Sequence, residues 1–178
     1  MTSILKVDNI QKANGSTPTA SDLGINTTGS VLNVKQAVQD TAFTIGTTES
    51  DIMSVQITPK STASDILVTI NLNAAHADSY SGLARLYRDS TVIGGGTGSN
   101  GANGLVGNIF NIRDANANSI FSYSMSYLDS PSSTSAITYT LKGKSAGTTL
   151  YINRTINNGN NEYNSTVMST ITVQEIGG

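Results

Sequence analysis

The chain has 178 residues, of which 12% are charged, and a formal net charge of -2 at pH 7. Because the few Lys and Arg residues are scattered singly, we expect no binding to nucleic acid. No apolar run approaches the ~20 residues that a membrane helix needs, so we expect no insertion into a membrane. The chain contains no cysteine, which excludes disulfides and thiolate metal sites. Ser, Thr and Asn make up more than a third of the residues and replace the charges that usually cover a protein surface.

Residues 1–30 differ from the rest of the chain. They open with a short extended run that contains Ile4, Leu5, Val7 and Ile10, and turn-forming residues fill the part that follows. This opening run does not have the pattern of a secretory signal. Since the segment has too few apolar residues for a core of its own, we predict an N-terminal attachment arm with these four residues as its docking residues. A flexible tail is the alternative.

From Val31 onward, apolar residues occur at every second position in one short run after another. A period of two places these side chains on one face of a strand, and Gly, Asn and Ser turns separate the runs. The expected strands cover residues 31–38, 42–45, 52–58, 65–73, 83–89, 91–93, 105–113, 119–127, 137–141, 149–156 and 166–176.

The stretch from Ser119 to Leu141 is the most regular part of this pattern. Two alternating runs flank Pro131, which cannot continue a central strand. We therefore predict a two-strand unit with one dry face and one hydroxyl-covered face, and a second sheet that covers the dry face. The dry face consists of Phe121, Tyr123, Met125 and Tyr127 in the first run and Ile137, Tyr139 and Leu141 in the second.

The fold class follows from this spacing. No stretch of ten or more residues has a helical period, and about ten short strands separated by turns are typical of a sandwich or barrel. We predict an all-β fold, a jelly-roll-type antiparallel β-sandwich over residues 31–178, preceded by the short extended arm of residues 1–30.

A search for catalytic and metal-binding patterns finds none. His76 is the only histidine, and we expect it in a loop, where Asp78 is too close in sequence to orient it as in a catalytic triad. Glu49 and Asp51 are the only close pair of acids, on a turn, and do not suggest a metal site. The glycine-rich residues 94–104 lack the lysine of a phosphate-binding loop. We therefore expect neither an enzyme nor a cofactor.

Polar loops with isolated tyrosines suggest binding instead. Exposed Tyr beside Asn and Ser is typical of adaptable binding surfaces, and anchoring of the loop by a partly buried ring is the alternative interpretation. The predicted contact residues are Tyr80, then Thr97, Asn100 and Asn103 in the glycine-rich loop, and Asn158, Asn160 and Tyr163 in the asparagine-rich loop.

Several segments together carry a family resemblance. The chain resembles small fibre-like structural proteins of marine tailed bacteriophages, especially those that infect cyanobacteria and related ocean bacteria. The resembling segments span most of the chain, and none is a catalytic signature. They are SILKVDNIQKANGSTPTASDLG, ITPKSTASDILV, LARLYRD, SYLDSPSSTSAITYTL and STITVQEIGG.

The resemblance implies a virion protein that is assembled in the host cytoplasm and exposed on the particle surface. It implies a homotrimeric tail-fibre tip with a jelly-roll knob, docked to other virion proteins by its arm and in contact with a host-surface glycan or protein. Burial between subunits would also offset the low hydrophobic content of 37%. Two alternatives stay open: a capsid decoration, head fibre or connecting protein without a receptor role, and, least favoured, a glycan depolymerase with a site between subunits.

Overall fold

The computed structural model describes residues 9–19, 21–23, 27–76, 80–97, 107–113, 117–157 and 165–178. These residues form eleven strands and one short 3-10 helix, η1. No helix in this part of the chain is long and apolar enough to cross a membrane. The elements are η1 (Ser21–Leu23), β1 (Val31–Gln39), β2 (Phe43–Ile45), β3 (Ser50–Ile57), β4 (Asp65–His76), β5 (Gly82–Arg88), β6 (Thr91–Ile93), β7 (Phe110–Ile112), β8 (Phe121–Asp129), β9 (Ile137–Ser145), β10 (Leu150–Ile152) and β11 (Ser169–Ile176).

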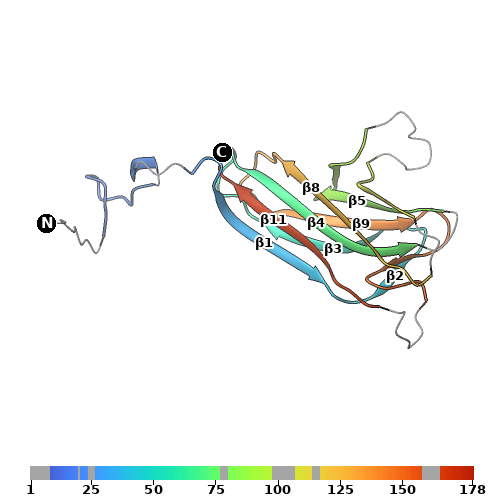
Figure 1. The fold of residues 1–178 in the computed structure, drawn as a ribbon. Coiled ribbons are helices and arrows are strands. Elements are labelled where there is room, and N and C mark those ends of the chain that lie inside the picture. Colours follow the sequence, from blue (N-terminus) through green and yellow to red (C-terminus); the bar gives the residue numbers. More distant parts are fainter. Residues whose placement is uncertain are drawn as a thin grey trace.

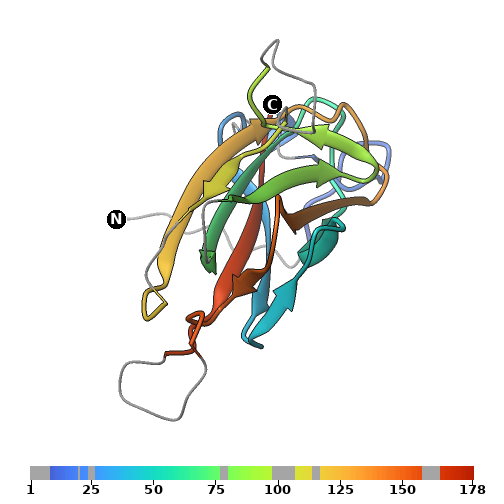
Figure 2. The ribbon, with the colours of Figure 1, turned by 90° about the vertical axis from the view of Figure 1, so that its right-hand side faces the viewer.

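The strands form two antiparallel sheets that face each other (Figures 1 and 2). The first sheet has the order β1-β11-β4-β10-β2, with β8 on the other side of β4, and we call it sheet A. The second has the order β3-β9-β5-β6, with β7 also paired to β5, and we call it sheet B. Strands from the beginning of the chain pair with strands from its end in a nested order: β1 with β11, β3 with β9, β4 with β8, and β5 with β6.

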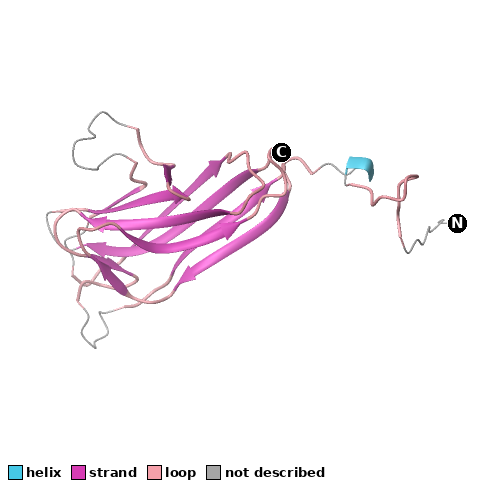
Figure 3. Cartoon of the chain, turned by 180° about the vertical axis from the view of Figure 1, so that it is seen from behind, coloured by secondary structure: helices cyan, strands magenta, loops and turns pink. Residues whose placement is uncertain are grey.

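This nested pairing is that of a long antiparallel hairpin rolled into two layers, which is the jelly-roll arrangement. The predicted all-β jelly-roll sandwich is therefore confirmed. Figure 3 shows strands throughout the folded body, with η1 in the segment before it. Since β1 begins at Val31, its start agrees with the start of the alternating pattern. The attachment role of residues 1–30 stays a prediction.

The predicted pairing of the two runs between Ser119 and Leu141 is wrong. β8 pairs with β4 in sheet A, whereas β9 lies between β3 and β5 in sheet B. The connection around Pro131 therefore passes from one sheet to the other. Apolar side chains of both strands point towards the same core, but from opposite sides. Alternation shows which face of a strand is apolar, and it does not distinguish a hairpin from a crossing between sheets.

The core lies between the inner faces of the sheets. From β4, the side chains of Ile66, Val68, Ile70 and Leu72 are completely buried, as the alternation predicts. Tyr139, Leu141 and Leu86 are the buried counterparts in sheet B. Full burial of one such aliphatic side chain contributes about 1.5–3 kcal/mol, so the β4 row alone is a major source of stability.

Strand β1 carries its alternating apolar residues on the outer face of the sheet and not on the core face. Val34 and Val38 pair with Gln174 and Thr170 and lie on the outer face of sheet A, where each is 50% exposed. Ala37, paired with the buried Ile171, faces the core instead. A register shift between Val31 and Asn33 separates the first residues of the strand from this alternation. The apolar pattern of β1 therefore marks an exposed face.

Two strand ends also differ from the expected ranges. β10 stops at Ile152 because Asn153 adopts a left-handed conformation with φ of 58°, which directs the chain out of the sheet. β11 begins at Ser169, so Val167, which we expected on the same face as Ile171, is exposed before the strand starts.

A buried polar cluster connects the sheets near the start of β4. Asp129, at the end of β8, accepts hydrogen bonds from Arg88 Nη1 at 2.9 and 3.1 Å and from the Tyr139 hydroxyl at 2.7 Å. Burial, followed by this hydrogen bond, raises the pKa of Tyr139 far above its ordinary value. One carboxylate from sheet A thus joins two strands of sheet B, and each hydrogen bond to a charged group contributes about 1.5–3 kcal/mol.

A second buried cluster lies at the opposite end. The Asn153 amide donates to the carbonyl oxygens of Gln39 and Thr41 at 2.6 and 3.3 Å, and its oxygen accepts from Ser169 Oγ at 2.6 Å. Asn73 N donates in turn to Ser169 Oγ at 2.9 Å. The cluster therefore connects the ends of β1 and β10 to β4 and β11, and it satisfies backbone groups that would otherwise be buried without partners.

Candidate functional site

The two long sides of the sandwich are unlike. On one side β1 packs against β3 and closes the gap between the sheets. On the other side β8 faces β6 and β7, which have three residues each. A cleft of about 620 Å³ opens here, and it is the candidate functional site. Its lining consists of Arg85, Val92, Ile93, Gly94, Gly95, Gly96, Thr97, Gly107 and Tyr127.

Strands β6 and β7 position the cleft. Both pair with the same edge of β5, so they act as two halves of one strand that the glycine-rich segment interrupts. The chain leaves the sheet after Ile93 and returns near Ile109, whose N–H donates to the Ala84 carbonyl at 2.8 Å. The predicted single strand over residues 105–113 is therefore shorter than expected, and Val106 lies outside the described residues.

Close packing explains two glycines of this segment. Gly94 has φ of 69°, and a Cβ there would lie 3.2 Å from the Tyr127 ring. A Cβ on Gly95 would lie 2.2 Å from the backbone of Gly107, which no side chain allows. The Gly107 N–H donates to the Gly96 carbonyl at 3.1 Å and holds the two ends of the loop together. The glycines thus form the base of the loop, where backbone meets backbone.

The charge of Arg85 at the cleft wall is balanced. Its Nη1 lies 3.3 Å from Glu49 Oε1, and its Nε donates to Asn108 Oδ1 at 3.1 Å. Glu49 also accepts a hydrogen bond from the Tyr87 hydroxyl at 2.7 Å. Burial, and then this hydrogen bond, raises the pKa of Tyr87. A paired guanidinium beside an aromatic ring and glycine backbone suits a neutral polar ligand better than a phosphate.

Two of the predicted contact residues, Tyr80 and Thr97, are among the residues that the structure describes. Thr97 lines the cleft. Tyr80 lies at the end of the sandwich away from the arm, 52% exposed, with its ring packed over Gly147: a Cβ there would lie 2.4 Å from it. Tyr80 is therefore both an anchor of its loop and an exposed aromatic side chain. Outside the described residues lie Asn100, Asn103, Asn158, Asn160 and Tyr163.

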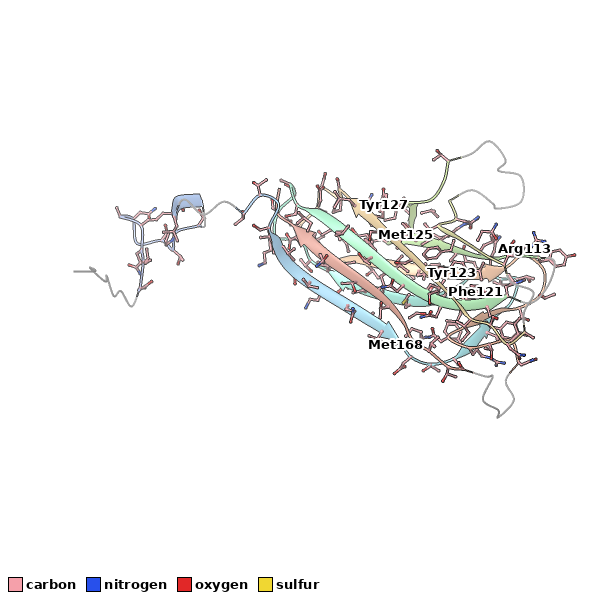
Figure 4. All side chains as sticks on the ribbon, viewed as in Figure 1. Arg113, Phe121, Tyr123, Met125, Tyr127 and Met168 are labelled. Atoms are coloured by element: carbon pink, nitrogen blue, oxygen red, sulfur yellow. The ribbon has the colours of Figure 1, made fainter. Side chains whose placement is uncertain are left out.

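Arg85 and Tyr127 are cleft residues that the sequence pattern did not single out. Tyr127 was interpreted as a packing residue of a dry face, and it is half-buried because that face reaches the open side of the sandwich. Figure 4 shows it in one row with Phe121, Tyr123 and Met125 along β8. Tyr123 contacts Phe110 of β7 with 5.8 Å between ring centroids, which joins the two sheets beside the cleft. No signal in the sequence alone marks an open side.

Of the four predicted docking residues, the structure describes only Ile10, which is 51% exposed. Ile4, Leu5 and Val7 lie outside the described residues. The described part of this segment extends away from the sandwich (Figure 1) and contains a local ion pair of 2.6 Å between Lys12 and Asp22. That ion pair, together with hydrogen bonds from Thr19, lowers the pKa of Asp22.

The prediction that His76 belongs to a loop is wrong. It is the last residue of β4, it is completely buried, and its Nε2 lies 2.8 Å from Ser145 Oγ. Asp78 lies outside the described residues. Glu49 and Asp51 form ion pairs with Arg85 and Lys142. Among the described residues, no three His, Cys, Asp or Glu side chains converge as a metal site.

Comparison with known proteins assigns the chain to no family. No protein-family model and no curated protein matches the chain. Among solved structures, those of infectious bursal disease virus are similar: the Gx strain at 11% identity with a TM-score of 0.44, and the Gt strain at 13% with 0.43. The match covers 80% and 84% of this chain, which spans 40% and 39% of those chains. A crystal structure of the VP2 subviral particle matches at 13% identity and a TM-score of 0.35. With TM-scores below 0.5, these matches carry no argument about this chain.

Proposed function

We propose that the chain is a structural protein of a phage particle, a trimeric fibre-tip knob that docks by residues 1–30 and contacts the host surface through loops. Its place in the virion, its trimeric state and its receptor role are parts of this proposal. The observation that carries it is that the two ends of the sandwich differ. The segment before Val31 leaves from one end of the sandwich (Figure 1). Tyr80 follows β4 at the other end, where its ring packs over Gly147 between β9 and β10.

The first end is built as an attachment point. Here the Gly29 N–H donates to the Gly177 carbonyl at 2.6 Å, and the Gly177 N–H donates to the Ser30 carbonyl at 2.9 Å. The root of the arm is therefore tied to the C-terminal strand β11, the neighbour of β4 in the middle of sheet A. A force on the arm therefore acts on β11 and on its neighbour β4 in the middle of the sheet. This arrangement suits a link between a knob and a particle.

The other end suits recognition. It presents the exposed ring of Tyr80, and the asparagine-rich loop starts there at Asn157, whose N–H donates to the Ala117 carbonyl at 2.9 Å. Rigid strands that hold polar loops are the usual arrangement of a binding surface. The neutral cleft beside Tyr127 and Thr97 offers a second contact for an uncharged polar group of a host glycan.

Two measurements test the proposal. Labelled full-length protein should bind susceptible host cells and compete with phage adsorption, and Tyr80→Ala should weaken that binding. Replacement of Ile4, Leu5, Val7 and Ile10 by Ser should abolish incorporation into particles while cell binding persists. Leu23→Ser is the matched control, because Leu23 is another exposed apolar residue of the same segment. A properly folded protein that binds no host cells would contradict the receptor role, and incorporation without host binding would support the decoration or connecting role instead.

A further inference from the structure

On the outer face of sheet A, three rows of side chains across its four long strands carry no charge, and Asp65, at the start of β4, lies on the same face beyond them. The register places its side chains in three rows that run from β1 through β11 and β4 to β8. The side chains of the middle row form two hydrogen-bonded pairs. Gln36 Nε2 lies 2.8 Å from Thr172 Oγ1, and Thr69 Oγ1 lies 3.2 Å from Ser126 Oγ. The rows are Val34, Gln174, Leu67 and Leu128; Gln36, Thr172, Thr69 and Ser126; and Val38, Thr170, Asn71 and Ser124.

The outer face of sheet B is built differently. Lys142 of β9 forms an ion pair of 2.9 Å with Asp51 of β3 and lies 5.2 Å from the centre of the Tyr87 ring. Arg85 of β5 and Glu49 form a second ion pair beside it. These four charged side chains lie on the outer face of sheet B, whereas the three rows of sheet A have none. Depletion of charge is typical of the buried centre of a protein interface.

The edge of sheet A at β8 adds a second unusual feature. Free sheet edges invite pairing with other chains, and proteins protect them with charges, bulges or very short strands. The β1 edge has a register shift and the exposed Lys35, the β3 edge has a register shift after Asp51, and β6 and β7 have only three residues each. β8 runs for nine residues with an unbroken register against β4, and its only charged residue is Asp129 at its end.

The side chains of β8 also leave apolar surface uncovered. Phe121 is 45% exposed and Leu128 is 53% exposed, at opposite ends of the strand and on opposite faces of the sheet. Between them Tyr123 and Met125 are only half-buried (Figure 4). Because the three uncharged rows end at β8, face and edge form one continuous surface.

We propose that this surface, the outer face of sheet A with the free edge of β8, is where copies of this chain bind one another. The inference deepens the proposed function, since it assigns the contact surface of the trimer. A second copy is the occupant that the chemistry favours: the three uncharged rows meet another uncharged surface of the same chain without like-charge repulsion and without unpaired buried charges.

Geometry supports a closed ring of such copies. A threefold assembly needs a heterologous contact, in which two different patches of each chain meet. The face and the edge are two such patches, and they adjoin at β8. Four strands and three rows span about 20 by 20 Å, or roughly 400 Å². A stable contact buries about 800 Å² per partner, so the β8 edge and its aromatic row are needed to complete the interface.

A matched pair of lysine substitutions tests this assignment. Thr172 and Thr138 both lie on an outer face, on a strand flanked on both sides, and each accepts a hydrogen bond from a glutamine of an edge strand, Gln36 or Gln56. Thr172→Lys would bury a charge in the proposed interface, and we expect the dissociation constant for association to rise by about two orders of magnitude or more. Thr138→Lys should leave association unchanged.

The measurement is the mass of the full-length protein over a dilution series, by sedimentation or light scattering. The wild type is expected at three times the 18.5 kDa of one chain, and Thr172→Lys should shift towards 18.5 kDa while circular dichroism shows an intact β-fold. Ser124→Lys, at an exposed position of β8, gives the same test if Thr172→Lys fails to fold.

The outcomes separate this inference from the proposed function. Lysine variants of sheet A that remain trimeric, or loss of association in Thr138→Lys instead, would overturn the assignment and leave the trimeric knob intact. A monomeric wild type would overturn both the assignment and the trimer. Host-cell binding, measured on the same samples, decides the receptor role independently.

Discussion

Removal of one hydroxyl group, in Tyr139→Phe, tests the buried cluster that joins the two sheets. The Tyr139 ring is completely buried, and its hydroxyl donates to Asp129 Oδ2 at 2.7 Å. Phenylalanine keeps the ring and removes a hydrogen bond to a charged group, which is worth about 1.5–3 kcal/mol. Asp129 keeps its two contacts with Arg88, so no carboxylate is left unpaired. We expect the free energy of unfolding to fall by about 2 kcal/mol.

Urea unfolding at pH 7, at one fixed protein concentration, measures this loss. The concentration must be fixed because the apparent stability of an oligomer depends on it. Tyr151→Phe is the control, since Tyr151 lies on the short strand β10 with its ring 5.2 Å from the Arg154 guanidinium, a contact that phenylalanine retains. It should change the free energy of unfolding by less than ~0.5 kcal/mol. An equally small change in Tyr139→Phe would refute the role assigned to the cluster.

The same variant also tests the raised pKa of Tyr139, through the dependence of stability on pH. Because the pKa of Tyr139 is raised in the folded protein, above its unfolded value of about 10, the folded state holds this proton when the unfolded state releases it. The contribution is complete below pH ~10 and is lost as the pH rises further, at about 1 kcal/mol per pH unit. The stability difference between the wild type and Tyr139→Phe should therefore shrink above pH ~10. A difference that stays constant up to pH ~11 would contradict the raised pKa.

Two further substitutions test the loop base and the distal cluster. Gly95→Ala should lower the free energy of unfolding by about 2 kcal/mol or more, since its Cβ would overlap the Gly107 backbone, whereas Gly96→Ala, with open space around it, should change stability by less than ~0.5 kcal/mol in the same urea titration. Asn153→Ala should cost about 3 kcal/mol, measured by thermal unfolding, because the half-buried Gln39 carbonyl loses its donor and the buried Ser169 hydroxyl loses its acceptor. A loss below ~1 kcal/mol would show that the cluster is not a structural link.

The sequence predicted the features of the fold that depend on neighbouring residues, and it missed those that depend on contacts between distant residues. In β4 the alternation of apolar residues predicted the buried side chains from Ile66 to Leu72, because a strand has only two faces and the core takes one. The same rule failed in β1, where Val34 and Val38 are half-exposed, since a pattern of apolar residues does not tell a core from an interface. His76 was misassigned for a related reason: a lone polar residue at the end of a long alternation can be buried when a partner such as Ser145 lies across the core.

The candidate site was even less visible, because its parts come from distant segments. Arg85 and Tyr127 lie 42 positions apart and meet only because β5 and β8 belong to different sheets at the open side. Thr97, predicted as a contact residue of the glycine-rich segment, lines the cleft, and its contact role stays a prediction. That Gly94 and Gly95 are needed at its base is a consequence of contacts with Tyr127 and Gly107 that no local rule contains.

By itself, the sequence determined that the chain is all-β, where most of its strands lie, and that few charges cover its surface. These properties depend on side-chain period and composition, which are local. Tertiary structure alone decided that β8 and β9 belong to opposite sheets, that one side of the sandwich is open, and that two ion pairs form on the outer face of sheet B. Pairing between strands far apart in the chain decides these features, because the nested order of a jelly roll brings the first strand to the last.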